Sequence, residues 1–544
     1  MVEEETIAPD QKTPPRLADW VPAQKYDYSA YTREAESAWD CNARVYEWDG
    51  DEGDVGPEFP ELEVQIFGDP EKRGMQGVDF AKIDSITVTQ EGPVHVHCIE
   101  KFEDAGLHPV MLKNIELAGY QVPTPIQRYA IPSINQGFDL IAIAQTGSGK
   151  TAAYLIPILN QLMGKAKQLA APRPNPAEFG QGAPRVRAEP LVLVVCPTRE
   201  LAIQIFNEAR KFAYRTMLRP CVLYGGCPAS EQRAQIQKGC DILVATPGRL
   251  VDFMEMPNIL SLRRMKFMVI DEADEMIADP GWNADISKIM GGGDGNIKYV
   301  LCSATFPKQA RDLAREYLSE QHVRIRVGRA GSSHECIKQN IVWVEPSLKK
   351  KALEDLIRTM PPVRTIIFVN SKRAADDVDD FLFNMGFPCT SMHSDRTQKE
   401  REAAMRAFRG GAAPILITTG VTARGIDVRK VMHVINYDLP SLDHGGIEEY
   451  VHRIGRTGRI GHRGLATSFY CDRDEPIGSV LTRTLLETGQ DVPDFLEHFI
   501  PEGEAREHLK FEADSDYDPE EANDEAKSHG DDAETDTGFS GGWC

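Results

Sequence analysis

Apolar runs of five to seven residues alternate with longer stretches of mixed polarity between Lys101 and Pro501. The runs are aliphatic and rich in β-branched residues, which is typical of strands that are buried on both faces, and the stretches between them have the length of helices. The alternation therefore predicts an α/β protein built on open parallel sheets. We expect strands at residues 140–144, 191–196, 220–224, 241–246, 267–271 and 299–305, and then at 341–345, 365–370, 414–419 and 434–438.

A polar break separates these two sets of strands, so we expect two tandem domains. The predicted divisions are an N-terminal extension at 1–100, a first domain at 101–328, a linker at 329–335, a second domain at 336–501 and a C-terminal tail at 502–544. One long insertion, Gly164 to Pro190, is rich in Pro, Ala and Gly and is predicted to be a surface loop.

The charge of the chain is concentrated at its ends. The net charge is −22, of which residues 1–100 carry −15 and residues 502–544 carry −12, so the segment between them carries +5. A mildly basic middle is compatible with contacts to a phosphate backbone. The acidic ends are either solvated tails or mimics of RNA that compete for the basic face.

The two ends differ in their aromatic content. The C-terminal tail has few apolar residues and is predicted to be disordered. The N-terminal extension, which we expect to be partly disordered, contains Trp20, Tyr26, Tyr28, Tyr31, Trp39, Tyr46 and Trp48 in an acidic background. These aromatic residues either form a linear motif that binds a protein partner or fold back on the core.

Cysteine usage and the start of the chain bear on the compartment. The 11 cysteines include no CxxC pair, which favours reduced thiols. The first residues are acidic and polar, unlike a signal peptide, and no apolar run approaches the roughly 20 residues of a membrane span. We therefore expect a cytoplasmic protein without a membrane partner, with shuttling to the nucleus left open.

A glycine-rich segment follows the first predicted strand and precedes a helical pattern. It reads AQTGSGKT and comprises Ala144, Gln145, Thr146, Gly147, Ser148, Gly149, Lys150 and Thr151. In that context the glycines allow backbone N–H groups to surround phosphate oxygens, Lys150 reaches the β and γ phosphates, and the Thr151 hydroxyl can bind Mg²⁺. The alternative is a glycine-rich turn without a ligand. The segment predicts a nucleotide-binding site.

Another candidate segment is acidic: DEAD at 271–274 comes at the carboxyl end of another predicted strand, where open sheets bind their ligands. Asp271 is placed to hold Mg²⁺ and Glu272 to orient and deprotonate the attacking water. A lone acidic segment could instead be a solvated helix start. Further along, HRIGRTGR at 452–459 places three arginines at three-residue spacing, which suits a second lobe that reaches a γ-phosphate.

With these motifs in this order, the segment from Phe102 to about Phe499 resembles the DEAD-box family of ATP-dependent RNA helicases in superfamily 2, whose two domains are RecA-like. The resemblance implies that Gln127 in GYQVPTPIQ reads the adenine edge, with Tyr120 and Phe102 beside the nucleotide, and that Asp427 holds the ribose. It also implies that Arg456 and Arg459 are arginine fingers on the transferred phosphate.

The same resemblance implies the RNA and coupling residues. The RNA backbone contacts are Pro197, Thr198, Arg199, Gly226, Thr246, Pro247, Gly248 and Arg249 in the first domain, and Asn370, Arg401 and Thr419 in the second. The residues that couple the two domains are Asp274, Ser303, Thr305, His452 and Arg453. Backbone contacts imply binding of single-stranded RNA and short duplexes independently of sequence, and no DNA substrate is expected.

Finer features resemble the Vasa/Ded-type subfamily, namely PELEVQIFG, GVDFAKIDSITV, VGRAGSS, QNIVWVE and HRGLATSFY. Two positions depart from the family pattern. Gly420 stands where the family's TDVAARG motif has a carboxylate, and Ser394 stands where its HGD motif has glycine. The chain also lacks the RGG repeats that Vasa-type proteins often carry.

The motifs together predict an RNA-dependent ATPase that uses ATP and Mg²⁺ to unwind short duplexes locally or to remodel RNA–protein complexes. One alternative is an ATP-dependent RNA clamp with weak turnover, which the Gly420 departure would favour. Another is a P-loop motor that acts on DNA or on no nucleic acid.

Overall fold

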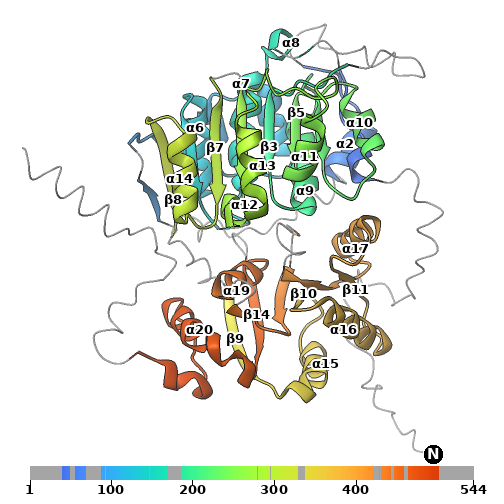
Figure 1. Cartoon of the computed structure of the whole chain (residues 1–544), viewed down its shortest axis with the longest axis vertical. Helices are drawn as coiled ribbons and strands as arrows, with labels where there is room; N and C mark the ends of the chain where they lie inside the picture. The colour runs from blue at the N-terminus through green and yellow to red at the C-terminus, as the bar shows by residue number, and fades with distance from the viewer. Residues whose placement is uncertain are drawn as a thin grey trace, which may run out of the picture.

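The computed structural model describes residues 39–48, 55–68, 87–91, 93–145, 147–169, 171, 186–278, 280–293, 296–328, 337–420, 428, 431–442, 446–458 and 464–501. These residues form two α/β lobes that stack end to end, with the first lobe above the second in Figure 1. Each lobe is an open sheet with helices on both faces, as the alternating apolar runs predict.

The first lobe contains an eight-stranded sheet with the order β1-β8-β2-β7-β6-β3-β5-β4. Its strands are β1 (Val88–Gln90), β2 (Asp139–Ile143), β3 (Val192–Val195), β4 (Pro220–Leu223), β5 (Ile242–Ala245), β6 (Phe267–Asp271), β7 (Lys298–Ser303) and β8 (His322–Val327). Its helices are α5 (Pro109–Leu117), α6 (Pro125–Asn135), α7 (Lys150–Leu162), α8 (Ala166–Leu169), α9 (Arg199–Phe212), α10 (Ala229–Ile236), α11 (Pro247–Met254), α12 (Ala273–Ala278), α13 (Pro280–Met290) and α14 (Lys308–Tyr317).

The second lobe contains a six-stranded sheet with the order β11-β12-β10-β13-β14-β9. Its strands are β9 (Ile337–Trp343), β10 (Arg364–Val369), β11 (Cys389–Met392), β12 (Ile415–Thr419), β13 (Val431–Asn436) and β14 (Gly464–Tyr470). Its helices are α15 (Lys349–Thr359), α16 (Lys372–Asn384), α17 (Gln398–Gly410), α19 (Gly446–Ile454) and α20 (Glu475–Glu487). Short 3₁₀ turns lie at Pro346–Leu348, Asp472–Asp474 and Asp494–Phe499.

Each sheet buries both of its faces. In β6 all five residues are buried, and alternate side chains of the central strands enter two separate apolar clusters on opposite faces of the first sheet. The second sheet is covered in the same way by the clusters that contain Leu353 and Phe408. Strands buried on both faces cannot show polar alternation, which is why their sequences are continuously apolar.

The parallel α/β architecture is confirmed, although four strands were not predicted. In β8 the sequence HVRIRV alternates charged and apolar residues, and β8 pairs with β1 in antiparallel orientation. The short strand β11 has the polar sequence CTSM. In β14 the buried hydroxyls have partners, since Thr467 bonds to His433 and Ser468 to Asn436. A search for continuous apolar runs does not find such strands, because their polar residues obtain hydrogen-bond partners only in the folded protein.

The described part of the N-terminal extension packs on the first lobe. Trp39 and Cys41 join the core around α7, while Tyr46 and Leu62 surround the ring of Tyr214. Cys41 lies in the 3₁₀ turn η1 (Asp40–Asn42), which Trp39 directly precedes, and Leu62 lies in helix α2 (Pro60–Phe67). For Trp39 and Tyr46, folding back on the core is therefore the arrangement adopted; the aromatic residues at 20–31 lie outside the described residues, as do the predicted linker and C-terminal tail.

The surface insertion contains the short helix α8, and its residues 172–185 lie outside the described part. Among the described residues, no helix combines the length and the apolar character that a membrane crossing requires.

Candidate ATP and RNA sites

The glycine-rich loop joins the end of β2 to the start of α7. Gly147 and Gly149 have φ angles of 81° and 91°, which L-residues with a side chain rarely adopt. The Lys150 ammonium donates to the carbonyl oxygen of Ala144 at 2.6 Å, so the loop curls around its own lysine. Ser148 is buried, and its Oγ has no hydrogen-bond partner among the described residues. A curled loop with an unpaired buried hydroxyl fits a phosphate cradle; Gln145 and Thr151 are half-buried along it, and Thr146 lies outside the described residues.

Gln127 is fully buried directly behind this loop. Its Nε2 donates to the carbonyl of Gly149 at 3.1 Å, and its Oε1 accepts from the Thr124 backbone N–H at 3.0 Å. A side chain at position 149 would meet Gln127 Nε2 at 2.6 Å. The amide predicted to read adenine is thus in contact with the phosphate loop in this structure.

The two other predicted nucleotide neighbours lie in the first lobe. Phe102 is buried in its core. The Tyr120 hydroxyl donates to Glu208 at 3.4 Å, and its ring lies 6.0 Å from that of Phe212, so these contacts are with α9.

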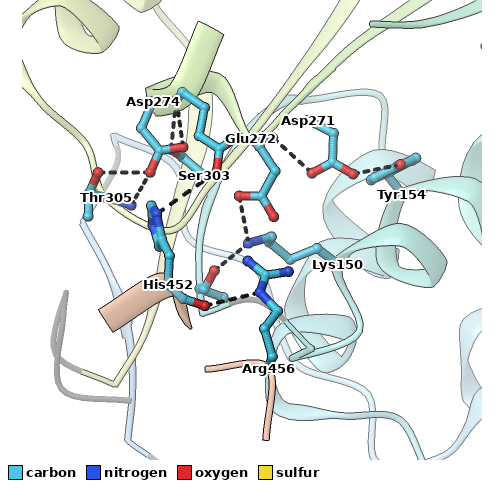
Figure 2. Close-up of polar contacts among 11 residues, drawn as sticks. Lys150, Tyr154, Asp271, Glu272, Asp274, Ser303, Thr305, His452 and Arg456 are labelled. Atoms are coloured by element: carbon cyan, nitrogen blue, oxygen red, sulfur yellow. Dashed lines mark hydrogen bonds and ion pairs between the residues drawn. The ribbon is translucent and has the colours of Figure 1, made fainter. Parts of the chain in front are cut away.

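The DEAD carboxylates meet Lys150 at the carboxyl end of β6 (Figure 2). Glu272 lies 3.9 Å from the Lys150 ammonium. Asp271 accepts the Glu272 backbone N–H on Oδ1 at 3.1 Å and the Tyr154 hydroxyl on Oδ2 at 3.0 Å. Glu272 has a φ of 52°, a left-handed conformation that is uncommon outside glycine and that clusters at functional sites.

Burial and mutual repulsion perturb this cluster. Burial, and next the charge of Glu272, raise the pKa of Asp271 to about 7, against the opposing charge of Lys150. Burial alone would lower the pKa of Lys150, but the two carboxylates raise it. The lysine is therefore held charged, and the carboxylate pair would be stabilised by a further cation.

Asp274 links the acidic segment to the loop after β7. Its Oδ2 accepts from the backbone N–H and the hydroxyl of Thr305 at 3.0 and 2.8 Å, and its own N–H donates to the Ser303 hydroxyl at 3.2 Å. Burial would raise the pKa of Asp274, yet the nearby His452 and the Thr305 hydrogen bonds lower it. Three of the predicted coupling residues are thus bonded to one another.

The second lobe reaches this site through α19 and the turn after it. His452 Nδ1 lies 3.9 Å from Glu275 of the first lobe. Arg456 is buried, donates Nε–H to the His452 carbonyl at 3.0 Å, and points toward the face that carries Lys150 and Glu272 (Figure 2). Residues from both lobes therefore surround one site; Arg459 and Asp427 lie outside the described residues.

Arg453, which was predicted to bridge the lobes, bonds to three groups of the second lobe. Its guanidinium donates to Glu449 at 3.0 Å, to the Asp438 carbonyl at 2.8 Å and to Asn370 at 3.0 Å. Asn370, predicted to bind RNA, also donates to the Leu439 carbonyl at 2.6 Å. These contacts brace α19 against the end of β10.

The carboxylate of Glu449 occupies the space beside Gly420, where the sequence departs from the family pattern. A side chain at position 420 would collide with Oε1 of Glu449, the carboxylate that bonds Arg453. The carboxyl group missing at 420 is therefore replaced in space by one from α19. A side chain at 420 would therefore have to displace the Glu449 carboxylate from its bond with Arg453.

The residues predicted to hold RNA lie on the first lobe at two helix starts. Thr198 caps α9, its hydroxyl accepting the Leu201 N–H at 3.3 Å, and Thr246 and Pro247 begin α11. Helix N-termini present unpaired N–H groups to anions. Nothing lies within 4 Å of where a side chain would project at Gly248, while Pro197 is buried behind the α9 start. In the second lobe Thr419 ends β12.

Three arginines gather where these helix starts meet α17. Arg199 donates to Gln398 at 3.1 Å, and Arg401 lies 2.8 Å from Glu200. Burial, and next the charge of Arg401, lower the pKa of Arg199, and Arg249 adds to this repulsion. Gly226 packs on the Arg199 guanidinium, since a side chain there would lie 2.6 Å from it. Clustered like charges favour a phosphate ligand.

Tyr154, Glu200 and Glu449 are site residues that the sequence reasoning missed. Tyr154 had a detectable signal, because it lies four residues after Lys150 and therefore on the same face of α7. Glu449 had the same kind of signal, because it lies four residues before Arg453 in α19 and bonds to it. Glu200 pairs with Arg401 across the lobes and had no comparable signal.

Comparison with known proteins agrees with this arrangement. Residues 124–313 match the DEAD/DEAH box helicase family, and residues 348–461 match the helicase conserved C-terminal domain. A solved structure of S. cerevisiae Dbp5 bound to RNA and ADP BeF3 is 29% identical, with a TM-score of 0.60, covering 72% of this chain and 95% of that one. A Dbp5 variant bound to Gle1 and IP6 is 30% identical, with a TM-score of 0.57, covering 71% and 93%.

The chain belongs to the DEAD-box helicase family. It is an ATP-dependent RNA helicase and thus an RNA-dependent ATPase. The predicted fold class and the predicted enzyme class are both confirmed.

Proposed function

We propose that this helicase works as a two-lobed clamp that closes on ATP and RNA together. The observation that carries the proposal is that Lys150 and Glu272 of the first lobe face Arg456 of the second. Glu272 would orient and deprotonate the attacking water, and Arg456 would neutralise the charge that develops on the transferred phosphate. Loss of that phosphate would remove the ligand shared by the lobes and allow them to reopen.

The acidic site fits Mg²⁺. The Asp271 carboxylate and the Thr151 hydroxyl are hard oxygen donors. A divalent cation would offset the burial and the repulsion from Glu272 that together raise the pKa of Asp271. When bound, Mg²⁺ would neutralise phosphate charge.

RNA would lie across the starts of α9 and α11 and against α17. The clustered guanidiniums of Arg199, Arg249 and Arg401 support this path, and Arg401 Nε is buried without a hydrogen-bond partner among the described residues. Contacts of this kind hold phosphates irrespective of sequence. We therefore propose single-stranded RNA and short duplexes as substrates, pried apart locally, with no DNA substrate.

The deciding experiment measures ATP hydrolysis by the full chain with RNA, with DNA of the same sequence and with neither, beside Glu272→Gln. We expect stimulation by RNA alone and a loss of roughly 10²-fold or more in the variant. Tight ATP-dependent RNA binding without turnover would support the clamp alternative. Equal stimulation by DNA would contradict RNA selectivity.

We propose further that the chain is of the Vasa/Ded type, that its acidic extension binds protein partners, and that the protein is cytoplasmic. Helix α2, formed by PELEVQIF, supports the Vasa/Ded assignment. The free thiols of the described cysteines suit a reducing compartment such as the cytoplasm. Vasa-type structures without a counterpart of α2 would overturn the subfamily assignment. Pull-down with residues 1–100 and imaging of the tagged chain test the other two.

A further inference from the structure

Two cysteines that are far apart in the sequence meet beside the interlobe junction. Cys41 lies in η1, Cys227 follows Gly226, and their sulfur atoms are 3.4 Å apart. Their residues are 4% and 2% exposed. The helicase mechanism uses neither thiol.

The two cysteines come from segments that contact functional parts of both lobes. Next to Cys41, the Asp40 backbone N–H donates to Glu402 of α17 at 3.3 Å. The Asp40 carboxylate pairs with Arg406, also of α17, at 3.3 Å. On the other side, the Cys227 carbonyl accepts from Arg249 at 3.0 Å. The thiol pair therefore lies between α17 and the predicted RNA contacts.

The environment makes the two thiols unequal. The hydrogen bond with Cys41 lowers the pKa of Cys227, with help from Gln232 and Arg249, whereas the same bond and burial raise the pKa of Cys41. The Arg249 guanidinium, which bonds the Cys227 carbonyl at 3.0 Å, places a positive charge on the Cys227 side of the pair. Because the thiolate is the reactive form, we assign the attack to Cys227 and the resolution of the intermediate to Cys41.

We propose that Cys41 and Cys227 are a redox modification site, which a hydroperoxide converts into a disulfide that ties the N-terminal extension to the first lobe. The Cys227 thiol releases its proton, and the thiolate sulfur bonds to the terminal peroxide oxygen as the O–O bond breaks. This gives a sulfenic acid, and the leaving hydroxide or alkoxide takes up the released proton to become water or an alcohol. The Cys41 sulfur then bonds to Cys227 and displaces the hydroxyl, which leaves as water with the Cys41 proton. Two electrons pass from the two sulfurs to the peroxide.

Access to the pair depends on α17, and this part rests on the proposed clamp. Because Asp40 and Trp39 contact Glu402 and Lys399, opening the lobes removes the cover from η1. The disulfide is expected to form at least threefold more slowly with a non-hydrolysable ATP analogue and RNA than with neither.

The test treats the full chain with hydrogen peroxide, blocks remaining thiols with N-ethylmaleimide and identifies linked peptides by mass spectrometry without reductant. We expect a 41–227 crosslink that dithiothreitol reverses and that is lost in Cys41→Ser and in Cys227→Ser. Cys240→Ser is the matched control, since Cys240 is also buried in the first lobe, and it should retain the crosslink.

The oxidation of Cys98, which is exposed, shows whether enough hydrogen peroxide was added. If Cys98 is fully oxidised while Cys41 and Cys227 stay as thiols, or appear as separate sulfinic acids, the modification site is overturned. This result does not depend on either variant folding, because it is read from the unmodified chain. A crosslink that forms at equal rates with and without nucleotide and RNA would instead contradict the clamp while leaving the site intact.

Discussion

The two ends of the interlobe junction are built differently. At the nucleotide end, His452 lies 3.9 Å from Glu275, and Arg456 points toward a cluster that the first lobe has already assembled. At the α17 end, the lobes contact directly, with Arg401 2.8 Å from Glu200 and the Tyr224 hydroxyl 3.0 Å from Glu402. The first arrangement sets a guanidinium of the second lobe opposite the Lys150–Glu272 cluster, while the second holds the lobes together through side chains.

The difference assigns separate kinetic roles to the two ends. Groups that act on the transferred phosphate should alter kcat, whereas groups that hold the lobes beside the RNA path should alter the RNA concentration for half-maximal ATPase activity.

The largest effect is expected for Arg456→Ala. Removing a guanidinium that meets the transferred phosphate should lower kcat by roughly a thousandfold. RNA binding measured without nucleotide should not change. Steady-state ATPase assays with Arg473→Ala as an exposed second-lobe control check this, and a variant that changed mainly the RNA requirement would break the division of roles.

Arg401→Gln tests the α17 end. The substitution removes a guanidinium from the predicted RNA path and leaves Glu200 buried without its ion pair, so half-saturating RNA should rise by roughly 10- to 100-fold. The matched control is Arg406→Gln, one turn further along α17 with a more exposed partner. An RNA titration in which kcat falls instead would argue against the assignment.

Tyr154→Phe sharpens the nucleotide end. The change removes only the hydroxyl that donates to Asp271, and loss of a hydrogen bond to a charged group should lower kcat by roughly tenfold at fixed Mg²⁺. Tyr46→Phe serves as the control, because that hydroxyl lies in the N-terminal extension and bonds the Pro57 carbonyl instead. Unchanged kcat over a Mg²⁺ titration would show that Asp271 is oriented without it.

A smaller, pH-dependent effect is expected at Glu402. Burial, and next the charge of Asp40, raise its pKa to about 7, so the closed lobes bind a proton more tightly than the open lobes. Closure is then favoured at low pH and weakens as pH rises from the ordinary carboxyl range to about 7. Half-saturating RNA should rise about fivefold between pH 6 and 8, and Glu402→Gln should abolish that rise; persistence in the variant would assign it elsewhere.

The smallest effect is expected for Asp40→Asn. Its ion pair with Arg406 is partly exposed, so half-saturating RNA should change only about twofold. Glu255→Gln, which breaks an exposed pair within the first lobe, should change nothing. A tenfold effect would mean that η1 holds the lobes together more strongly than its exposed contact indicates.

The sequence pattern was sufficient to predict site residues that come directly after a buried strand. The loop at Ala144–Thr151 and the carboxylates at 271–272 were predictable because each follows a buried apolar strand, and parallel strands bring their carboxyl ends to one edge. The strands β1, β8, β11 and β14 were not predicted, because each mixes polar with apolar residues. In β8 and β14 the polar side chains have partners far along the chain, such as Glu91 for Arg324 and His433 for Thr467, that no local window contains.

Glu449 shows most clearly what lay beyond the sequence pattern. Read along the chain, Gly420 looked like the loss of a carboxylate, whereas in space Glu449 fills its place and bonds Arg453. Similarly, nothing near Cys41 in the sequence indicates Cys227 or α17.

The sequence by itself determined the α/β class, the ATP-binding motifs and the family, because each depends on residue types at short spacing. Only the tertiary structure decided which groups from the two lobes meet, how the Gly420 gap is filled and where the extension crosses the junction. Those features depend on contacts between residues far apart in the chain, and their identity is set by packing and burial rather than by any local preference.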